Sequence, residues 1–186
     1  MPEIPEHLAG AYRHLIGLPE APPPPPWRQL RACGVGGLTD VGFLDSTDML
    51  LVMSHDGRGV FDCLTGERLA RDRSREFEFD TANLLARGIG ALGDRLIRTA
   101  GPYGGGLAVQ TADGWRLERL TLVWPHDYLF LTPPGHHVLG AAFNKPGDVT
   151  RLPAMISEWR ASAFSPTGKA MVVATSSQLD IYRRDA

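Results

Sequence analysis

Two stretches of the chain, residues 39–72 and 159–182, follow the same order of short apolar segments and tight turns. In each, an apolar segment is followed by a turn, a second apolar segment and a further turn. The turns come at intervals too short for helices, and their spacing is about that of one four-stranded antiparallel blade. We therefore expect an all-β fold built from successive antiparallel sheets.

The first stretch contains four predicted strands: Thr39–Leu44, Met49–Ser54, Arg58–Cys63 and Glu67–Arg71. Two of their connections end in glycine, at Asp56-Gly57 and Thr65-Gly66. Glycine supplies the positive φ that a hairpin turn requires. The first stretch thus predicts one complete blade.

Three further units follow the same rule less clearly. A second is predicted over Leu84–Thr121, including the segments GLAVQTA and WRLERLT. A third covers Leu122–Met155, where DYLFLTPPG and HHVLGAAF are predicted strands among many prolines. The fourth, from Glu158, has only three strands, and we expect Trp27–Cys33 to supply its outer strand beside the last strand, because this pairing removes two open sheet edges.

The last unit resembles a WD-repeat blade. The resemblance is carried by the turn Ser165-Pro166-Thr167-Gly168-Lys169 and by the pair Ile181-Tyr182. The first unit resembles the same family more loosely, through Phe43-Leu44-Asp45 and Ser54-His55-Asp56-Gly57. The resemblance implies a small β-propeller-like array of about four antiparallel blades, and an open, twisted arrangement of several sheets is the alternative.

The N-terminal residues have a different pattern. Ile4–Leu18 places apolar residues at intervals of three and four, which predicts a short helix with one apolar stripe. Five prolines then precede Trp27, and they favour an extended polyproline II spacer over a ligand for an aromatic groove. We expect an N-terminal helix and spacer at residues 1–26 and a β-propeller-like domain at residues 27–186.

Composition narrows the possible partners and compartments. The net charge is −2, and the arginines, 17 of the 19 cationic residues, are interpreted as scattered among carboxylates, so we expect no nucleic-acid partner. No window approaches eighteen uncharged apolar residues, which predicts a cytoplasmic chain without a membrane span. Cys33 and Cys63 lack the spacing of metal ligands, so we expect no metal site, disulfide or cofactor.

No catalytic signature is present, and no catalytic residue is assigned. His126-Asp127 and His136-His137 are the residue types that a metal site or a general base needs. However, neighbouring histidines on a strand point to opposite faces, so at most one of that pair can address a given site. A surface or turn position is the simpler interpretation of all four.

The candidate binding residues are aromatic or charged and flank predicted turns: Tyr103, Trp124, His126, Asp127 and Tyr128. Tryptophan and tyrosine dominate the energetics of many protein interfaces. Glu76 and Glu78 alternate with Phe77 and Phe79, which predicts a strand with one acidic face. That face is either solvated or a contact for a basic partner.

These observations favour a non-enzymatic protein-binding module, and in a more specific form an immunity-type inhibitor of a partner toxin in a bacterial-type cytoplasm. Two alternatives stay open. One is a small-molecule hydrolase or lyase with His126, Asp127, His136 or His137 near a central pocket. The other is a structural subunit that docks through its N-terminal helix. The sequence gives no indication of oligomeric state.

Overall fold

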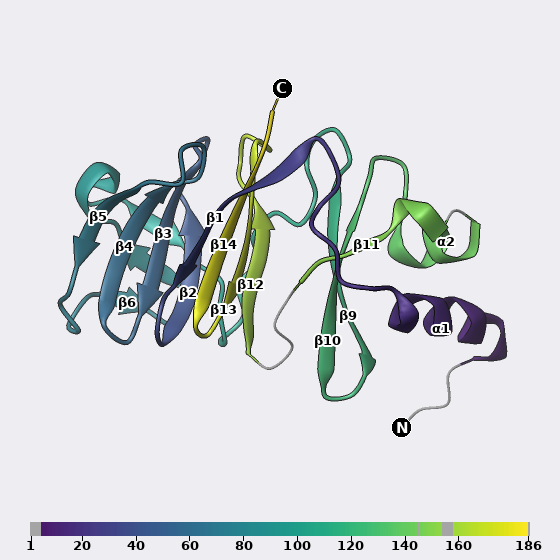
Figure 1. Ribbon diagram of the computed structural model, residues 1–186. Helices are drawn as coiled ribbons and strands as arrows, with labels where there is room; N and C mark the ends of the chain where they lie inside the picture. The colour runs from purple at the N-terminus through teal and green to yellow at the C-terminus, as the bar shows by residue number, and fades with distance from the viewer. Residues whose placement is uncertain (1–4, 145, 154–157, 186) are drawn as a thin grey trace. The chain divides into compact units, whose positions relative to one another are not determined.

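The computed structural model describes residues 5–144, 146–153 and 158–185, and its regular structure is mainly antiparallel β-sheet (Figure 1). The chain forms two compact units, each made from two separate segments. Unit 1 comprises Met1–Pro24 and Gln110–Ser157, and unit 2 comprises Pro25–Val109 and Glu158–Ala186. This division differs from the expected parts at 1–26 and 27–186, because residues 110–157 share a core with the N-terminal helix.

Unit 2 contains three antiparallel sheets. The central sheet has the order β2 (Leu38–Phe43), β3 (Met49–Ser54), β4 (Gly57–Asp62), β5 (Arg68–Asp72). The terminal sheet has the order β1 (Trp27–Gly34), β14 (Gln178–Arg184), β13 (Ala170–Thr175), β12 (Trp159–Phe164). The small sheet has the order β6 (Phe79–Asp80), β7 (Leu85–Arg87), β8 (Leu96–Arg98), with a 3-10 turn, η2 (Gly90–Leu92), before β8.

The strands predicted for the first repeat are confirmed to within one residue at each end. The two glycines expected in its turns have positive φ, +106° at Gly57 and +75° at Gly66. At Gly57 a Cβ atom would lie 2.2 Å from the carbonyl oxygen of Asp72. Only glycine fits this position, because both the backbone conformation and the space exclude a side chain.

The expected pairing of the two ends of unit 2 is also confirmed. β1 lies antiparallel beside β14, from Trp27 opposite Arg184 to Gly34 opposite Gln178 (Figure 1). The chain therefore builds the terminal sheet from its first strand and its last three strands. Among the described residues, however, the sheets form no closed barrel or ring.

Strands β2–β4 of the central sheet are buried on both faces, whereas β5 is largely exposed. Leu50, Val52 and Phe61 contribute to a cluster shared with the terminal sheet. Leu51, Met53 and Val60 point the other way, into a cluster shared with the small sheet. Burial on both faces explains why β3 (MLLVMS) is almost continuously apolar, and each large aliphatic side chain removed from water contributes roughly 1.5–3 kcal/mol.

Unit 1 packs two helices on a three-stranded sheet. Its elements are η1 (Glu6–Leu8), α1 (Ala9–Gly17), β9 (Arg116–Val123), β10 (His126–Thr132), α2 (Val138–Asn144), η3 (Pro146–Asp148) and β11 (Thr150–Arg151), with the sheet order β11-β10-β9. The N-terminal helix ends at Gly17, one residue before the predicted end at Leu18, and Ile4, its predicted start, lies outside the described residues. Its buried Ala11 and Leu15 share one cluster with Phe130 and Val138. None of the described helices is long and apolar enough to cross a membrane.

The second and third predicted blades are wrong as units. HHVLGAAF is not a strand, because β10 ends before Pro133-Pro134 and Val138–Asn144 forms α2, in which Ala141 and Ala142 are buried three and four residues after the buried Val138. GLAVQTA contains no strand, and WRLERLT forms most of β9. β9 pairs with β10 of unit 1 and not with the small sheet. Met155, the end of the third predicted unit, lies outside the described residues.

Candidate functional site

Four of the predicted binding residues lie together on the β9–β10 hairpin of unit 1. Trp124 is at the turn, with 76% of its surface exposed, and His126 is exposed beside it. The carboxylate of Asp127 accepts hydrogen bonds from Arg119 Nη1 (2.8 Å) and from the hydroxyl of Thr121. Asp127 is therefore engaged within its own hairpin, and it braces the two strands.

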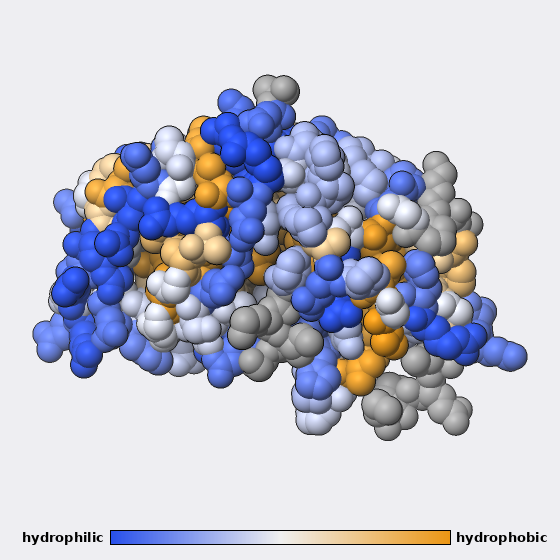
Figure 2. Space-filling view, viewed as in Figure 1, coloured by the Kyte–Doolittle hydropathy of each residue, from blue (hydrophilic) through white to orange (hydrophobic). Residues whose placement is uncertain are grey.

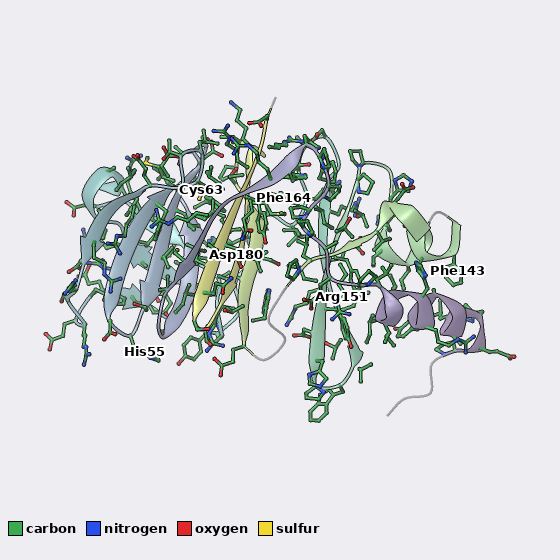
Figure 3. All side chains as sticks on the ribbon, in the orientation of Figure 1. His55, Cys63, Phe143, Arg151, Phe164 and Asp180 are labelled. Atoms are coloured by element: carbon green, nitrogen blue, oxygen red, sulfur yellow. The ribbon has the colours of Figure 1, made fainter. Side chains whose placement is uncertain are left out.

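Tyr128, the fourth residue of this hairpin, is partly buried. The guanidinium of Arg151, which is labelled in Figure 3, lies 4.6 Å from the centre of the Tyr128 ring. The ring of Tyr128 also stacks on that of Phe130, with 6.4 Å between the ring centres. Its neighbours are core residues of unit 1. Tyr128 thus supports the sheet, and Trp124 is the side chain that the hairpin offers to solvent.

The other predicted binding residues belong to unit 2. Tyr103 lies in a loop and is 74% exposed. Phe77 and Phe79 pack on the core while Glu76 and Glu78 are exposed, as the alternation predicted, although only Phe79 and Asp80 form a strand. Arg87 donates to the carboxylate of Glu78 at 2.9 Å from Nε and 2.8 Å from Nη2. The acidic face is therefore partly neutralised by the chain itself.

The histidine pair does not converge on a site with His126-Asp127. His136 Nε2 lies 3.2 Å from Asp148 Oδ2, and His137 is exposed immediately before α2. Among the residues that the structure describes, no group of three or more histidine, cysteine or acidic side chains could hold a metal ion.

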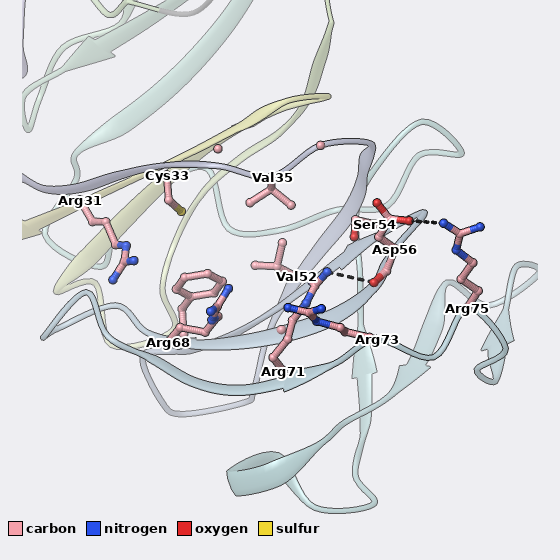
Figure 4. A pocket seen from close by; sticks show the side chains of 14 residues that line it. Arg31, Cys33, Val35, Val52, Ser54, Asp56, Arg68, Arg71, Arg73 and Arg75 are labelled. Atoms are coloured by element: carbon pink, nitrogen blue, oxygen red, sulfur yellow. Dashed lines mark hydrogen bonds and ion pairs between the residues drawn. The ribbon is translucent and has the colours of Figure 1, made fainter.

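A pocket of about 560 Å³ in unit 2 is the strongest candidate site, and it involves none of these residues. It lies between β1 with its following loop and the strands β3–β5 of the central sheet (Figure 4). Its volume is in the range of ligand pockets. The lining residues are Arg31, Cys33, Gly34, Val35, Gly36, Val52, Ser54, Asp56, Gly59, Phe61, Arg68, Arg71, Arg73 and Arg75.

Five arginines and a single carboxylate line this pocket, so it is strongly positive in a chain whose net charge is −2. Figure 2 shows hydrophilic side chains gathered over the β3–β5 side of unit 2, with smaller hydrophobic areas between them. Walls of low dielectric focus such a charge and attract anions. The pocket is therefore suited to an anionic group.

A β-bulge in β5 places two of the arginines on the same face. Arg71 lies opposite Gly59 and Arg68 opposite Phe61, and the extra residue, Leu69, separates the two pairs. Without the bulge, regular alternation would put residues 68 and 71 on opposite faces of the strand. The extra residue shifts the alternation by one, so the two side chains lie on the same face. Both guanidinium groups therefore belong to the face that lines the pocket.

A second bulge acts on the opposite wall. In β1, Gln29 lies opposite Tyr182 and Arg31 opposite Ile181, so Leu30 is the extra residue. From there Arg31 and Cys33 face the central sheet. Arg31 Nη1 donates to the carbonyl oxygen of Gly66 (2.7 Å), and its guanidinium lies 5.9 Å from the centre of the Phe61 ring. Arg31 is thus held in place at this end of the pocket.

Asp56 occupies the other end. Arg75 Nη2 donates to its carboxylate at 2.7 Å, and Arg71 Nη2 donates to its backbone carbonyl at 2.9 Å (Figure 4). Among the described residues, the guanidinium groups of Arg68 and Arg73 make no hydrogen bond or ion pair, so both are available to an incoming anion. The turn that Gly57 permits is what brings Asp56 to this position.

The floor between the arginines is apolar. Val52 and Phe61 are buried core residues, and Cys33 and Val35 pack against the same cluster. Gly59 opens this floor, since a Cβ atom there would meet only ordinary contacts, the nearest 3.5 Å away on Phe61. A glycine within a strand often marks a close approach by a ligand.

Cys33 and Ser54 are the residues in the pocket lining whose side chains can act as nucleophiles. Burial raises the pKa of the Cys33 thiol, and the nearby Arg31 opposes this shift only in part. The thiol stays protonated at neutral pH and donates to the carbonyl oxygen of Leu179 (3.6 Å). Ser54 likewise donates its hydroxyl to the carbonyl oxygen of Gly57 (3.1 Å). Both side chains are therefore donors to backbone carbonyl oxygens within the chain itself.

Sequence reasoning missed this pocket, although one signal was present. Residues 68–75 read RLARDRSR and contain four of its five arginines. The interpretation of the arginines as scattered is therefore wrong for this segment. The fifth, Arg31, reaches the site only through the pairing of β1 with β14.

Comparison of the sequence with known protein families found no match, and comparison with curated proteins found none.

Proposed function

We propose that this chain is a non-enzymatic binding module, that its partner is another protein, and that the arginine-lined pocket takes an anionic part of that partner. The observation that carries the proposal is the gathering of five arginines around one cavity with one carboxylate. A charge balance of this kind attracts an anion from solution and discriminates against cationic surfaces.

The arginines are also prepared for binding. Arg31 and Arg71 are fixed to backbone carbonyl oxygens, so they lose little conformational freedom when a ligand arrives. Arg68 and Arg73 keep their donors unused among the described residues. A guanidinium group offers two parallel N–H donors that match the two oxygens of a carboxylate.

In its more specific form, the proposal is an immunity-type inhibitor of a partner toxin. Small size and the absence of a catalytic signature favour this form. We also propose that the sheets of unit 2 are β-propeller-like and related to WD-repeat blades. The repeated strand order and the pairing of β1 with β14 support this relation.

The enzymatic alternative requires His126, Asp127, His136 or His137 beside a cavity. None of the four lines the arginine-lined pocket. No specific observation favours this alternative over the binding module.

The proposal is tested by capturing partners from an extract of the native host. The chain is immobilised as wild type, as the double variant Arg68→Gln with Arg71→Gln, and as the control Arg98→Gln. Arg98 is exposed on β8 and does not line the pocket, so its replacement changes charge elsewhere in the same unit. We expect a protein retained by wild type and control and lost from the double variant. Equal retention by all three would refute the proposal.

A further inference from the structure

We infer that the ligand of the pocket is an acidic peptide segment in which an apolar side chain lies between carboxylates. This inference rests on the proposed function and adds the chemical class of the bound group. It follows from the order of charges along the pocket, from its apolar floor and from the way in which Asp56 already uses one of the arginines.

The positive charges are concentrated at the two ends of the pocket. At one end, Arg31 and Arg68 lie beside Phe61, Arg31 above its ring and Arg68 opposite it in the sheet. At the other end, Arg71, Arg73 and Arg75 gather near the Asp56 turn (Figure 4). A ligand that satisfies both ends needs at least two separated anionic groups.

The space between the ends is unsuitable for an anion. Val52 and Phe61, which belong to the core, form its floor, and Cys33 and Val35 form part of the opposite wall. An oxyanion placed against these side chains would lose its hydration without gaining hydrogen bonds. An apolar side chain gains free energy there, because it removes its own surface from water.

This combination distinguishes a peptide from a phosphate group. Phosphate sites typically present several backbone N–H groups at a helix N-terminus or in a glycine-rich turn. No helix contributes to this pocket, and in the loop Gly34-Val35-Gly36, which does line it, the N–H of Val35 already donates to the carbonyl oxygen of Ser177 (2.9 Å). Ser54, the hydroxyl residue in the lining, already donates to Gly57. An extended chain places alternate side chains on the same face, which lets acidic residues flank an apolar one.

Asp56 shows how a carboxylate binds at this site. Its carboxylate accepts from Arg75 at 2.7 Å, and both side chains are well exposed, 61% and 77%. An exposed ion pair of this kind contributes little to stability. A carboxylate of the ligand can therefore replace that of Asp56 at small cost, and Asp56 competes with the ligand for Arg75.

The test uses fluorescently labelled peptides of the sequence Gly-Glu-Gly-Leu-Gly-Glu-Gly and Gly-Glu-Gly-Ser-Gly-Glu-Gly, in which the two glutamates and the central side chain share one face of an extended chain, with inorganic tripolyphosphate as a competitor. Binding to the full chain is measured by fluorescence anisotropy. We expect the leucine peptide to bind about tenfold more tightly than the serine peptide, since burying one leucine side chain supplies that preference. We expect tripolyphosphate to compete only weakly.

Two kinds of variant locate the binding. Arg68→Gln with Arg71→Gln is expected to abolish binding of both peptides, whereas Arg98→Gln leaves it unchanged. Gly59→Val places a side chain in the space above the apolar floor. It is expected to remove the preference for leucine while keeping weak binding of both peptides. Cys33→Leu narrows the same space from the opposite wall, so it gives the same test if Gly59→Val does not fold. Circular dichroism confirms the fold of each variant.

The outcomes separate this inference from the proposed function. If the serine peptide binds as tightly as the leucine peptide, or tripolyphosphate displaces both at lower concentration, the inference fails and anion recognition stands. If neither peptide binds while partner capture still depends on Arg68 and Arg71, the inference fails alone. If capture is independent of both arginines, the proposed function fails with it.

Discussion

The central and terminal sheets of unit 2 repeat the same design but obtain their outer strands differently. β2, β3 and β4 correspond to β12, β13 and β14, and both innermost pairs contain a register shift near the start of the first strand. Both first turns are closed by the same backbone hydrogen bonds, Leu44 N to Met49 O (3.0 Å) and Ser165 N to Ala170 O (2.9 Å). The outer strand is β5, next along the chain, in one sheet, and β1, from the start of the unit, in the other.

Comparing the two sheets shows which strands of a repeated fold can carry functional side chains. The inner strands of both sheets are buried and apolar, so packing fixes their residues. The outer strands are half exposed, and each carries a bulge that re-aims arginines. Because β1 and β5 come from sheets that pack together, the pocket lies between them.

The largest expected effect is on the free energy of unfolding, and it comes from removing a core side chain of the terminal sheet. Phe164, the last residue of β12 and labelled in Figure 3, is 1% exposed. Its ring centre lies 5.3 Å from that of Trp27 in β1. Phe164→Ala should lower the free energy of unfolding by about 3–5 kcal/mol. It should also speed amide exchange in β1, because Trp27 loses its support. Denaturant unfolding and hydrogen exchange measure both effects.

Phe43→Ala is the matched control, since Phe43 ends β2 and is 6% exposed. We expect a comparable loss of stability without selective exchange in β1. Equal exchange in β1 for both variants would show that the outer strand does not depend on its own sheet.

A second prediction concerns the second turn of each sheet. Gly57 in the central sheet has φ +106°, and its turn corresponds to Ser176-Ser177 in the terminal sheet. Gly57→Ala should cost roughly 1–3 kcal/mol because alanine is strained in this conformation and would clash with Asp72. Ser177→Ala, at an exposed position, should change stability by less than about 0.5 kcal/mol. Thermal unfolding compares the two, and equal effects would contradict the assigned turn geometry.

A third prediction tests the contact between the first turns of the two sheets. Thr167 Oγ1 donates to the buried carboxylate of Asp48 at 2.6 Å. Thr167→Val should lower the free energy of unfolding by about 1 kcal/mol, because the carboxylate loses a donor. Thr65→Val, in an exposed turn of the central sheet, is the control and should have a smaller effect. A loss no larger than that of the control would mean that the contact contributes nothing to holding the sheets together.

The smallest effect depends on pH. Burial raises the pKa of Asp180 in β14, and Gln178 and Gln29 oppose this only in part through hydrogen bonds of 2.8–3.0 Å. The folded chain therefore binds this proton more tightly than the unfolded chain, so the carboxyl favours folding at low pH and loses that contribution as pH rises through its raised pKa.

Asp180→Asn should accordingly raise the melting temperature at neutral pH, where the wild-type carboxylate is ionised. The advantage should shrink as the pH falls towards 3.8, the ordinary pKa of an aspartate. Melting curves across this range measure it. An advantage that stays constant with pH would show that ionisation is not its cause.

The repeated strands and their closure were predictable because they depend on local patterns. Alternating or continuous apolar segments between Asp-Gly and Thr-Gly turns identified β2–β5 to within one residue. The N-terminal helix was predictable for the same reason, from apolar residues at helical spacing. The segment HHVLGAAF was not, since a short apolar run fits a strand or a helix, and only its packing in the unit 1 core selected the helix.

The candidate site shows the same limit more strongly. The sequence indicated exposed side chains such as Trp124 and Tyr103, which local turn chemistry places at the surface. It did not indicate the pocket, because a bulge changes which residues share a face and alternation alone cannot reveal it. That Arg68 and Arg71 share a face follows only from the register of β5 against β4. That Arg31 lines the same pocket follows only from the packing of the terminal sheet, which contains β1, on the central sheet.

Short patterns in the sequence determine the strand periodicity, the glycine turns and the strand that each end of unit 2 contributes. These features depend on backbone sterics and on the burial of alternate side chains, and both act over a few residues. The tertiary structure decided which strand segments share a unit, which apolar run became a helix and which arginines surround one cavity. Those outcomes depend on register and on packing between distant segments, where a shift of one residue reverses the direction of every side chain that follows.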